Sequence, residues 1–88
     1  MVRQPLTAGQ IAAGQRLGTA LRAARAGRSL VEVAVAAGIS PETLRKIEAG
    51  RLPAPAFGTV VCLSQALDVP LSDLADIWLA DTAVSRAS

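Results

Sequence analysis

The sequence has no histidine and no tyrosine, one cysteine, and only two aromatic residues, Phe57 and Trp78. Without histidine, a lone cysteine can build neither an ordinary zinc site nor a cysteine–histidine catalytic pair, and it cannot form an intrachain disulfide. No glycine-rich phosphate loop follows a strand pattern, and no paired carboxylates suggest acid–base chemistry. We therefore expect no catalytic residue, no metal ligand and no cofactor, and a protein that is not an enzyme.

Long hydrophobic runs are also missing. No apolar stretch approaches the length of about 18 residues that a membrane-spanning helix needs. The N-terminus carries Arg3 and Gln4 before a stretch of Gly, Gln and Ala, instead of the apolar core of a signal peptide. We expect a cytoplasmic protein with no membrane partner, in which Cys62 is an inert small hydrophobe.

What remains is a chain of 88 residues, 51% of them hydrophobic, which is enough for one domain. Its core must be built from alanine, valine, leucine and isoleucine, which suits short, closely packed helices and predicts an all-α fold.

The charge is uneven. Residues 1–51 hold eight basic and three acidic side chains, whereas residues 52–88 hold one basic and four acidic side chains. Such a division is typical of a protein with one end facing a polyanion.

The first predicted helix covers residues 8–26, and Thr7 with Gln10 forms a capping-box pattern at its start. Three glycines lie in its first half: Gly9, Gly14 and Gly18. Each weakens a helix by up to about 1 kcal/mol relative to alanine. We therefore expect this half to be frayed or held only by packing.

A second helix is predicted over residues 30–37, with Ser29 as its N-cap and Gly38 as a left-handed stop. Three valines at alternate positions also fit a short strand: Val31, Val33 and Val35. We prefer the helix because Ser40-Pro41-Glu42 is a strong start signal for a third helix, which ends at Gly50.

The remaining chain predicts an extended connector over residues 51–55, which contains two prolines, and two further helices. The fourth helix ends near Asp68, and its expected inward-facing residues are Phe57, Val60, Leu63, Ser64 and Leu67. The fifth follows Pro70, with Ser72 as its predicted N-cap. Its apolar face carries Leu74, Ile77 and Trp78.

Residues 30–49 fit two helices that cross steeply around a glycine turn. The closest approach needs a small residue, which Ala34 supplies, and the chain reversal needs positive φ, which Gly38 supplies. An apolar wedge between the helices is formed by Val33, Ala37, Ile39, Leu44 and Ile47. Seven positions thus agree with a helix-turn-helix motif.

With this motif the sequence resembles the phage-repressor/Cro-like (Xre) helix-turn-helix family. The resemblance covers roughly residues 17–75 and rests on four blocks: residues 29–34 (SLVEVA), 37–40 (AGIS), 44–51 (LRKIEAGR) and 66–74 (ALDVPLSDL). It implies a five-helix, lambda-repressor-like DNA-binding domain over residues 17–80. Residues 1–16 would be an extension that lengthens the first helix, and residues 81–88 a frayed tail.

The resemblance further implies that the helix after Ser40 enters the major groove of double-stranded DNA. The residues that match the family's DNA contacts, or lie beside them, are Arg28, Ser29, Ser40, Pro41, Glu42, Thr43, Arg45, Lys46 and Arg51. Arg45 and Lys46 suit guanine or phosphate, and Glu42 suits cytosine N4. Phosphates are expected at Arg51 and at the amides after Ser29. The family's structural ion pair matches Arg25 and Glu48.

Three departures from the family pattern stand out. Leu30 replaces a glutamine that often clamps a phosphate, and the link between the first two helices is about two residues short. Val31 and Val35 lie on the normally polar outer face of the second helix, where they could contact a partner. Arg16 and Arg22 are interpreted as ordinary exposed helix residues.

We therefore predict a dimeric transcriptional regulator, a repressor or autoregulator, that binds an inverted repeat with half-sites about 34 Å apart. The predicted dimer interface is Leu74, Ile77 and Trp78, although a tryptophan on an apolar stripe also fits the core. Two alternatives remain open. One is an antitoxin that binds its operator and a toxin, and the other is a protein-interaction module that has lost DNA binding.

Overall fold

The computed structural model describes residues 6–80; the predicted tail at residues 81–88 and the first five residues of the predicted extension lie outside this range. The described part contains five α-helices and no strand, which confirms the all-α prediction. The helices are α1 (Ala8–Arg25), α2 (Leu30–Ala37), α3 (Pro41–Glu48), α4 (Phe57–Leu67) and α5 (Leu71–Trp78).

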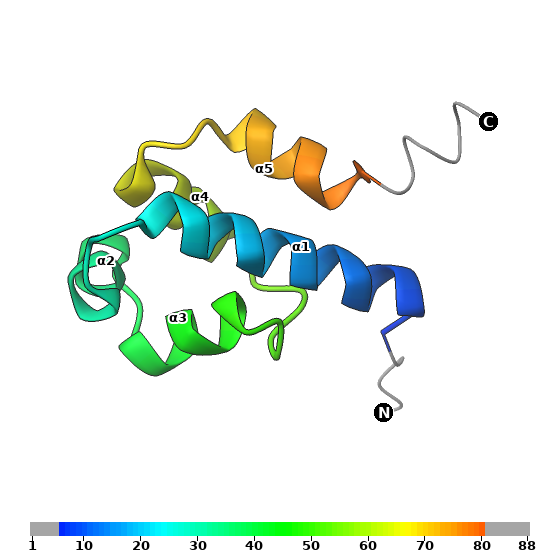
Figure 1. Cartoon of the computed structure of the whole chain (residues 1–88), viewed down its shortest axis with the longest axis horizontal. Coiled ribbons are helices and arrows are strands. Elements are labelled where there is room, and N and C mark those ends of the chain that lie inside the picture. The colour runs from blue at the N-terminus through cyan, green and yellow to red at the C-terminus, as the bar shows by residue number, and fades with distance from the viewer. Residues whose placement is uncertain (1–5, 81–88) are drawn as a thin grey trace.

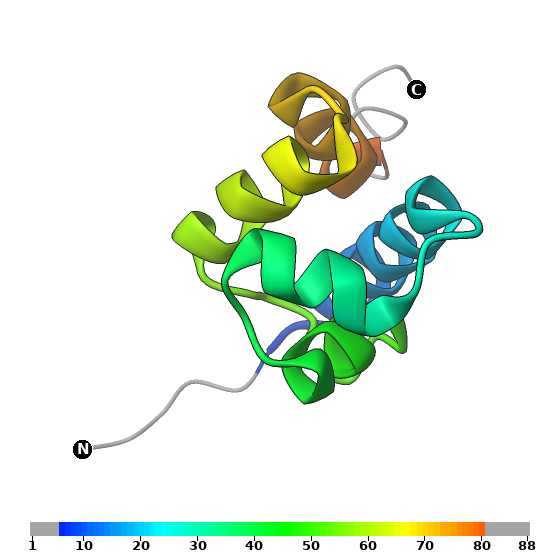
Figure 2. The ribbon, with the colours of Figure 1, turned by 90° about the vertical axis from the view of Figure 1, so that its left-hand side faces the viewer.

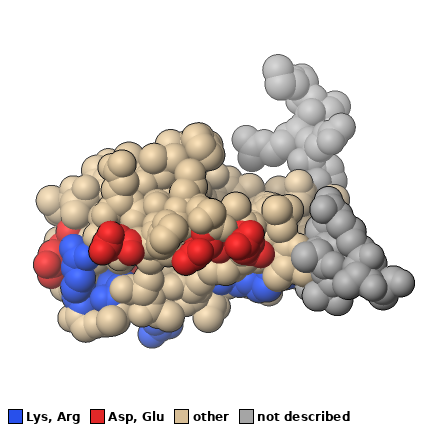
Figure 3. All heavy atoms as spheres, turned by 90° about the horizontal axis from the view of Figure 1, so that it is seen from above, with Lys and Arg blue, Asp and Glu red and all other residues tan. Residues whose placement is uncertain are grey.

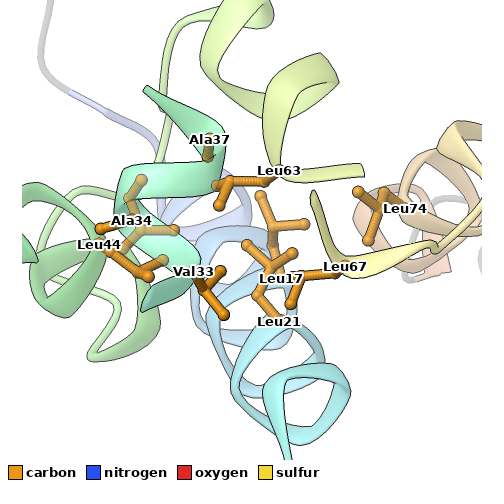
Figure 4. Close-up of a cluster of buried hydrophobic side chains, with 10 residues drawn as sticks. Leu17, Leu21, Val33, Ala34, Ala37, Leu44, Leu63, Leu67 and Leu74 are labelled. Atoms are coloured by element: carbon orange, nitrogen blue, oxygen red, sulfur yellow. The ribbon is translucent and has the colours of Figure 1, made fainter. Parts of the chain in front are cut away.

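The long helix α1 is the centre of the arrangement, with α3 on one side of it and α5 on the other (Figure 1). At one end of the molecule α2 packs against α3 and α4, and Figure 2 shows α2 at the front with α3 below it. Buried side chains from all five helices meet in one core (Figure 4): Leu17, Leu21, Val33, Ala34, Ala37, Leu44, Ile47, Leu63, Leu67 and Leu74.

The first three helices begin where the capping signals predict. Thr7 and Gln10 form a reciprocal capping box, with N···O distances of 3.0 and 2.9 Å. The Ser29 hydroxyl accepts a hydrogen bond from the amide of Glu32, and the Ser40 hydroxyl accepts one from the amide of Thr43. Because these residues satisfy amides that a helix leaves unpaired, they fix each start locally.

The glycine turn between α2 and α3 also has the predicted form. Gly38 lies at φ +74°, and the amide of Ile39 donates to the carbonyl of Ala34 at 3.0 Å. Residues 30–37 are helical, so the strand alternative is wrong. The short link before α2 closes as a tight turn, in which the amide of Arg28 donates to the carbonyl of Arg25. The helix therefore still begins at Leu30.

Two predictions near the C-terminal helices are wrong. Phe57 does not face inward: its side chain lies in the first turn of α4 and is 73% exposed. Ser72 is not the N-cap of α5, because that helix already begins at Leu71 with Pro70 at the cap position and no side-chain capping bond. The chain leaves α4 through Asp68 at φ +57°, and α5 begins two residues earlier than a cap at Ser72 implies.

The glycines of α1 explain how this helix can be intact from Ala8. A Cβ atom on Gly18 would lie 2.3 Å from the carbonyl oxygen of Ile47, at the end of α3. A Cβ atom on Gly14 would lie 2.4 Å from the Cα atom of Pro53 in the connector. The predicted packing therefore holds the helix, and these two positions allow other backbone segments to touch it directly.

We expect Gly18→Ala to destabilise the fold by about 2 kcal/mol, because the added methyl group meets backbone atoms that a side-chain rotation cannot move. Gly9→Ala in the same helix is the matched control. The nearest atom to its Cβ would be the Thr7 hydroxyl at 3.8 Å, so it should gain up to about 1 kcal/mol from helix propensity alone. Urea unfolding followed by circular dichroism measures both. Equal stabilisation by the two substitutions would contradict the close approach.

Candidate nucleic-acid interface

Helix α3 has one buried and one exposed face. Leu44 and Ile47 are buried in the core, at 0 and 1% exposure. The opposite face is open to solvent and presents Ser40, Glu42, Arg45, Lys46, Ala49 and, just beyond the helix, Arg51. This arrangement anchors the helix by its apolar side while its polar side remains available for a ligand.

The start of α3 is ordered by its own side chains. The hydroxyl groups of Ser40 and Thr43 lie 2.8 Å apart, in addition to the bond from the Thr43 amide to the Ser40 hydroxyl at 3.1 Å. Pro41 occupies the first turn, where its missing amide hydrogen has no consequence. These hydrogen bonds and the proline therefore fix the conformation of the first turn of α3, which follows the exposed N-cap Ser40.

The charged groups of α3 surround a shallow hollow lined by Glu42, Arg45, Lys46, Ala49 and Arg51. The Lys46 ammonium lies 3.7 Å from a Glu42 carboxylate oxygen, and both side chains are exposed. An exposed ion pair of this kind contributes little free energy, so either group can exchange its partner for a ligand. Within residues 6–80, neither the Arg45 nor the Arg51 guanidinium has a hydrogen-bond or ion-pair partner.

Arg51 is brought to the hollow by the turn that ends α3. Gly50 lies at φ +77° and donates its amide hydrogen to the carbonyl of Ile47 at 3.1 Å. The Arg51 amide reaches back to the carbonyl of Lys46 at 2.9 Å. These two bonds close the helix and place Arg51 beside the side chains of the last turn.

The predicted ion pair between Arg25 and Glu48 is confirmed. Two hydrogen bonds join the guanidinium to the carboxylate, at 2.8 and 2.9 Å, and the side chains are only 17 and 6% exposed. The hydrogen bonds that the Arg25 guanidinium donates to Glu48 raise the pKa of Arg25 above its ordinary value. The third guanidinium nitrogen donates to the carbonyl of Arg28. The pair links the ends of α1 and α3 behind the exposed face.

Arg28 has partners within the fold that sequence reasoning missed. Its guanidinium donates to the carbonyl of Ala66 at 2.8 Å, near the end of α4, and lies 3.8 Å from the carboxylate of Glu32. A phosphate contact by Arg28 would have to compete with both. Ser29 uses its hydroxyl as the cap of α2. Leu30 is half-buried against the core, whereas Val31 and Val35 are 55 and 71% exposed.

The predicted dimer residues lie in different environments. Leu74 is only 3% exposed and packs into the chain's own core, and it also lines the apolar groove beside Trp78, so its place in an interface stays a prediction. Ile77 and Trp78 are half-buried. Arg16 is not merely an exposed helix arginine, because it donates to the carbonyls of Ile77 and Trp78 at 3.1 and 2.9 Å. An apolar groove beside Trp78 is lined by residues of the connector, α1, α4 and α5.

The charge of the α5 side differs from that of α3. Figure 3 looks onto this side and shows acidic side chains across its middle, with lysine and arginine towards its margins. In the part of the chain that the structure describes, no group of three or more histidine, cysteine, aspartate or glutamate residues could hold a metal ion. Among the same residues, no helix is long and apolar enough to cross a membrane.

Comparison with known proteins supports the helix-turn-helix fold. The family model described as a helix-turn-helix domain matches residues 16–77. Among solved structures, the clp gene regulator ClgR from C. glutamicum is similar, with 28% sequence identity and a TM-score of 0.66. The match covers 89% of this chain and 95% of that one. No curated protein matches the sequence.

Proposed function

Because the chain belongs to the helix-turn-helix domain family, we propose that it binds double-stranded DNA with sequence specificity and regulates transcription. The observation that carries this proposal is the exposed face of α3, which presents Arg45 and Arg51 without partners among the described residues while its other face is buried. The similarity to a solved gene regulator supports the same function. The four sequence blocks named above favour the Xre group within the family.

In the proposed complex α3 lies in the major groove with its exposed face towards the bases. Arg45 and Lys46 would read guanine or bind phosphate, and Glu42 would accept a hydrogen bond from cytosine. The ordered first turn, with Ser40, Pro41 and Thr43, would lie close to the backbone. Arg51 and the amides after Ser29 would bind phosphates.

We further propose a homodimer that acts as a repressor or autoregulator on an inverted repeat. The apolar groove that Trp78 lines supports an interface there, and the other half-buried residue of the predicted interface, Ile77, directly precedes Trp78 in α5. Phe57 also lines this groove and is 73% exposed. In a dimer its side chain would expose less apolar surface to solvent than in a monomer. The half-sites would then be separated by about one helical turn of DNA.

The second candidate function is contact with another protein, as in an interaction module or in an antitoxin that covers a toxin. It is favoured by Val31 and Val35, which lie one turn apart on α2 and are both exposed. They lie on α2 and not on the exposed face of α3, so a protein contact there would use other side chains than the proposed base contacts.

The test uses DNA fragments selected by the chain from genomic DNA. Lys46→Ala should weaken binding to a selected fragment by about 1–3 kcal/mol more than it weakens binding to random duplex, because a base contact is lost in addition to a positive charge. Arg51→Ala should weaken binding to both DNAs alike, because a phosphate contact carries no sequence information. Arg22→Ala, on the exposed surface of α1, is the charge-matched control. Equal effects of Lys46→Ala and Arg51→Ala on both DNAs would contradict this division of roles.

A further inference from the structure

The first half of α1 packs against the connector that carries Arg51. Residues 8–15 precede the part of the chain that the family model matches, yet they belong to the same continuous helix. The backbone at Gly14 approaches Pro53 so closely that an added Cβ would lie 2.4 Å from its Cα atom and 2.6 Å from its carbonyl oxygen. The stem of Gln15 covers Gly50, where an added Cβ would lie 2.9 Å from the Gln15 Cγ atom.

The connector needs this support because few bonds hold it. Among residues 6–80, only the amides of Arg51 and Leu52 are tied back to α3 after Gly50, both to the carbonyl of Lys46 at 2.9 and 3.2 Å. Arg51 and Leu52 are exposed, and the first half-buried residue of the connector is Pro53. Arg51 therefore lies between two contacts with α1, at Gly50 and at Pro53.

The helix start that provides these contacts is itself fixed by local bonds. The capping box of Thr7 and Gln10 begins α1 almost two turns before Gly14. Most residues of this segment are exposed, and its buried positions are Ala13 and Gly14. The segment thus adds little to the core cluster, and it contacts Pro53 at Gly14 and Gly50 at Gln15.

We propose that residues 8–15 are a positioning element for DNA binding, which holds the backbone at Arg51 so that its guanidinium meets a phosphate. This inference rests on the proposed function. A long arginine side chain loses less freedom on binding when its backbone is already fixed, so the contact with α1 raises affinity without touching DNA.

The test is a double-mutant cycle in the full chain, with random duplex DNA as the probe. Gly14→Ala displaces the connector, and Gly9→Ala in the same segment is the control, because its Cβ would make only an ordinary contact with the Thr7 hydroxyl at 3.8 Å. We expect Gly14→Ala to weaken binding about three- to tenfold and to reduce the salt slope, as loss of one phosphate contact does. In an Arg51→Ala background, Gly14→Ala should cause no further loss. Gly9→Ala should leave affinity and slope unchanged.

Gln15→Ala gives a second measurement with an exposed residue, so that folding is retained if Gly14→Ala proves unfolded by circular dichroism. It should weaken binding about threefold, again only when Arg51 is present. Equal losses in the Arg51 and Arg51→Ala backgrounds, or no loss from Gln15→Ala, would overturn the inference while DNA binding itself stands. Absence of DNA binding by the unsubstituted chain would instead overturn the proposed function and this inference with it.

Discussion

Raising the salt concentration from about 50 to 200 mM is expected to weaken binding of the chain to random duplex DNA by about 10³-fold. Three cations, Arg45, Lys46 and Arg51, surround the hollow on α3 and can each displace a counterion from a phosphate. A dimer doubles this to about six contacts, and each contributes a slope of about −0.9 to the dependence of log K on log salt.

Fluorescence anisotropy with a labelled random duplex measures the slope directly. Arg51→Ala should make it shallower by about one unit for each bound copy, whereas Arg22→Ala should leave it unchanged. A slope near −3 in the unsubstituted chain would indicate one bound copy in place of two. Binding that does not change with salt would contradict DNA binding by this face and favour the protein-interaction module.

The helix starts and the helix-turn-helix motif could be predicted because their signals are local. Ser29 and Ser40 each cap an amide three residues away, and Gly38 is needed for a positive φ within its own turn. Such contacts depend on sequence spacing alone. The same holds for the exposed face of α3, since burial of Leu44 and Ile47 fixes which side faces solvent.

The contacts that could not be predicted join residues far apart in the sequence. A glycine inside a helix pattern indicates lost helix propensity, and nothing near Gly14 in the sequence shows that Pro53 will pack there. Arg16 and Arg28 have the spacing of surface residues, yet they donate to carbonyls at Ile77, Trp78 and Ala66. Helix periodicity also predicted wrongly that Phe57 faces inward. Phe57 lies in the first turn of α4, which extends beyond the core, whereas later residues of the same helix are buried in it.

Helix α3 is held from three directions, which matters for a surface that must present side chains at fixed spacing. The core holds Leu44 and Ile47, α1 lies against the last carbonyls of α3 at Gly18, and Arg25 binds Glu48. Two of these three supports act at the end of the helix near Arg51. The exposed face of α3 is therefore held most firmly at the C-terminal end of the helix, beyond which no further helical hydrogen bonds support it.

Glu48→Ala is expected to lower the free energy of unfolding by about 3 kcal/mol. It removes both hydrogen bonds to Arg25 and leaves a guanidinium that is 17% exposed without its counter-charge. The value lies at the low end for a buried pair because Arg25 keeps this exposure and its bond to the carbonyl of Arg28. Because Glu48 raises the pKa of Arg25, the stabilisation that the charged Arg25 contributes is complete at any pH below the ordinary arginine pKa. It is lost only when strong alkali deprotonates the guanidinium.

The matched control is Glu32→Ala, which breaks an exposed pair with Arg28 whose charged atoms lie 3.8 Å apart. That loss should stay within about 1 kcal/mol, because solvent screens the pair. Urea unfolding at neutral pH compares the two, and a cycle with Arg25→Ala separates the pair from the rest of the Glu48 side chain. Similar losses for Glu48→Ala and Glu32→Ala would show that the Arg25–Glu48 pair does not hold α3 against α1. In that case Glu48→Ala should also leave DNA affinity unchanged. If the pair does hold the helix, we expect Glu48→Ala to lower DNA affinity even under conditions where the variant is fully folded.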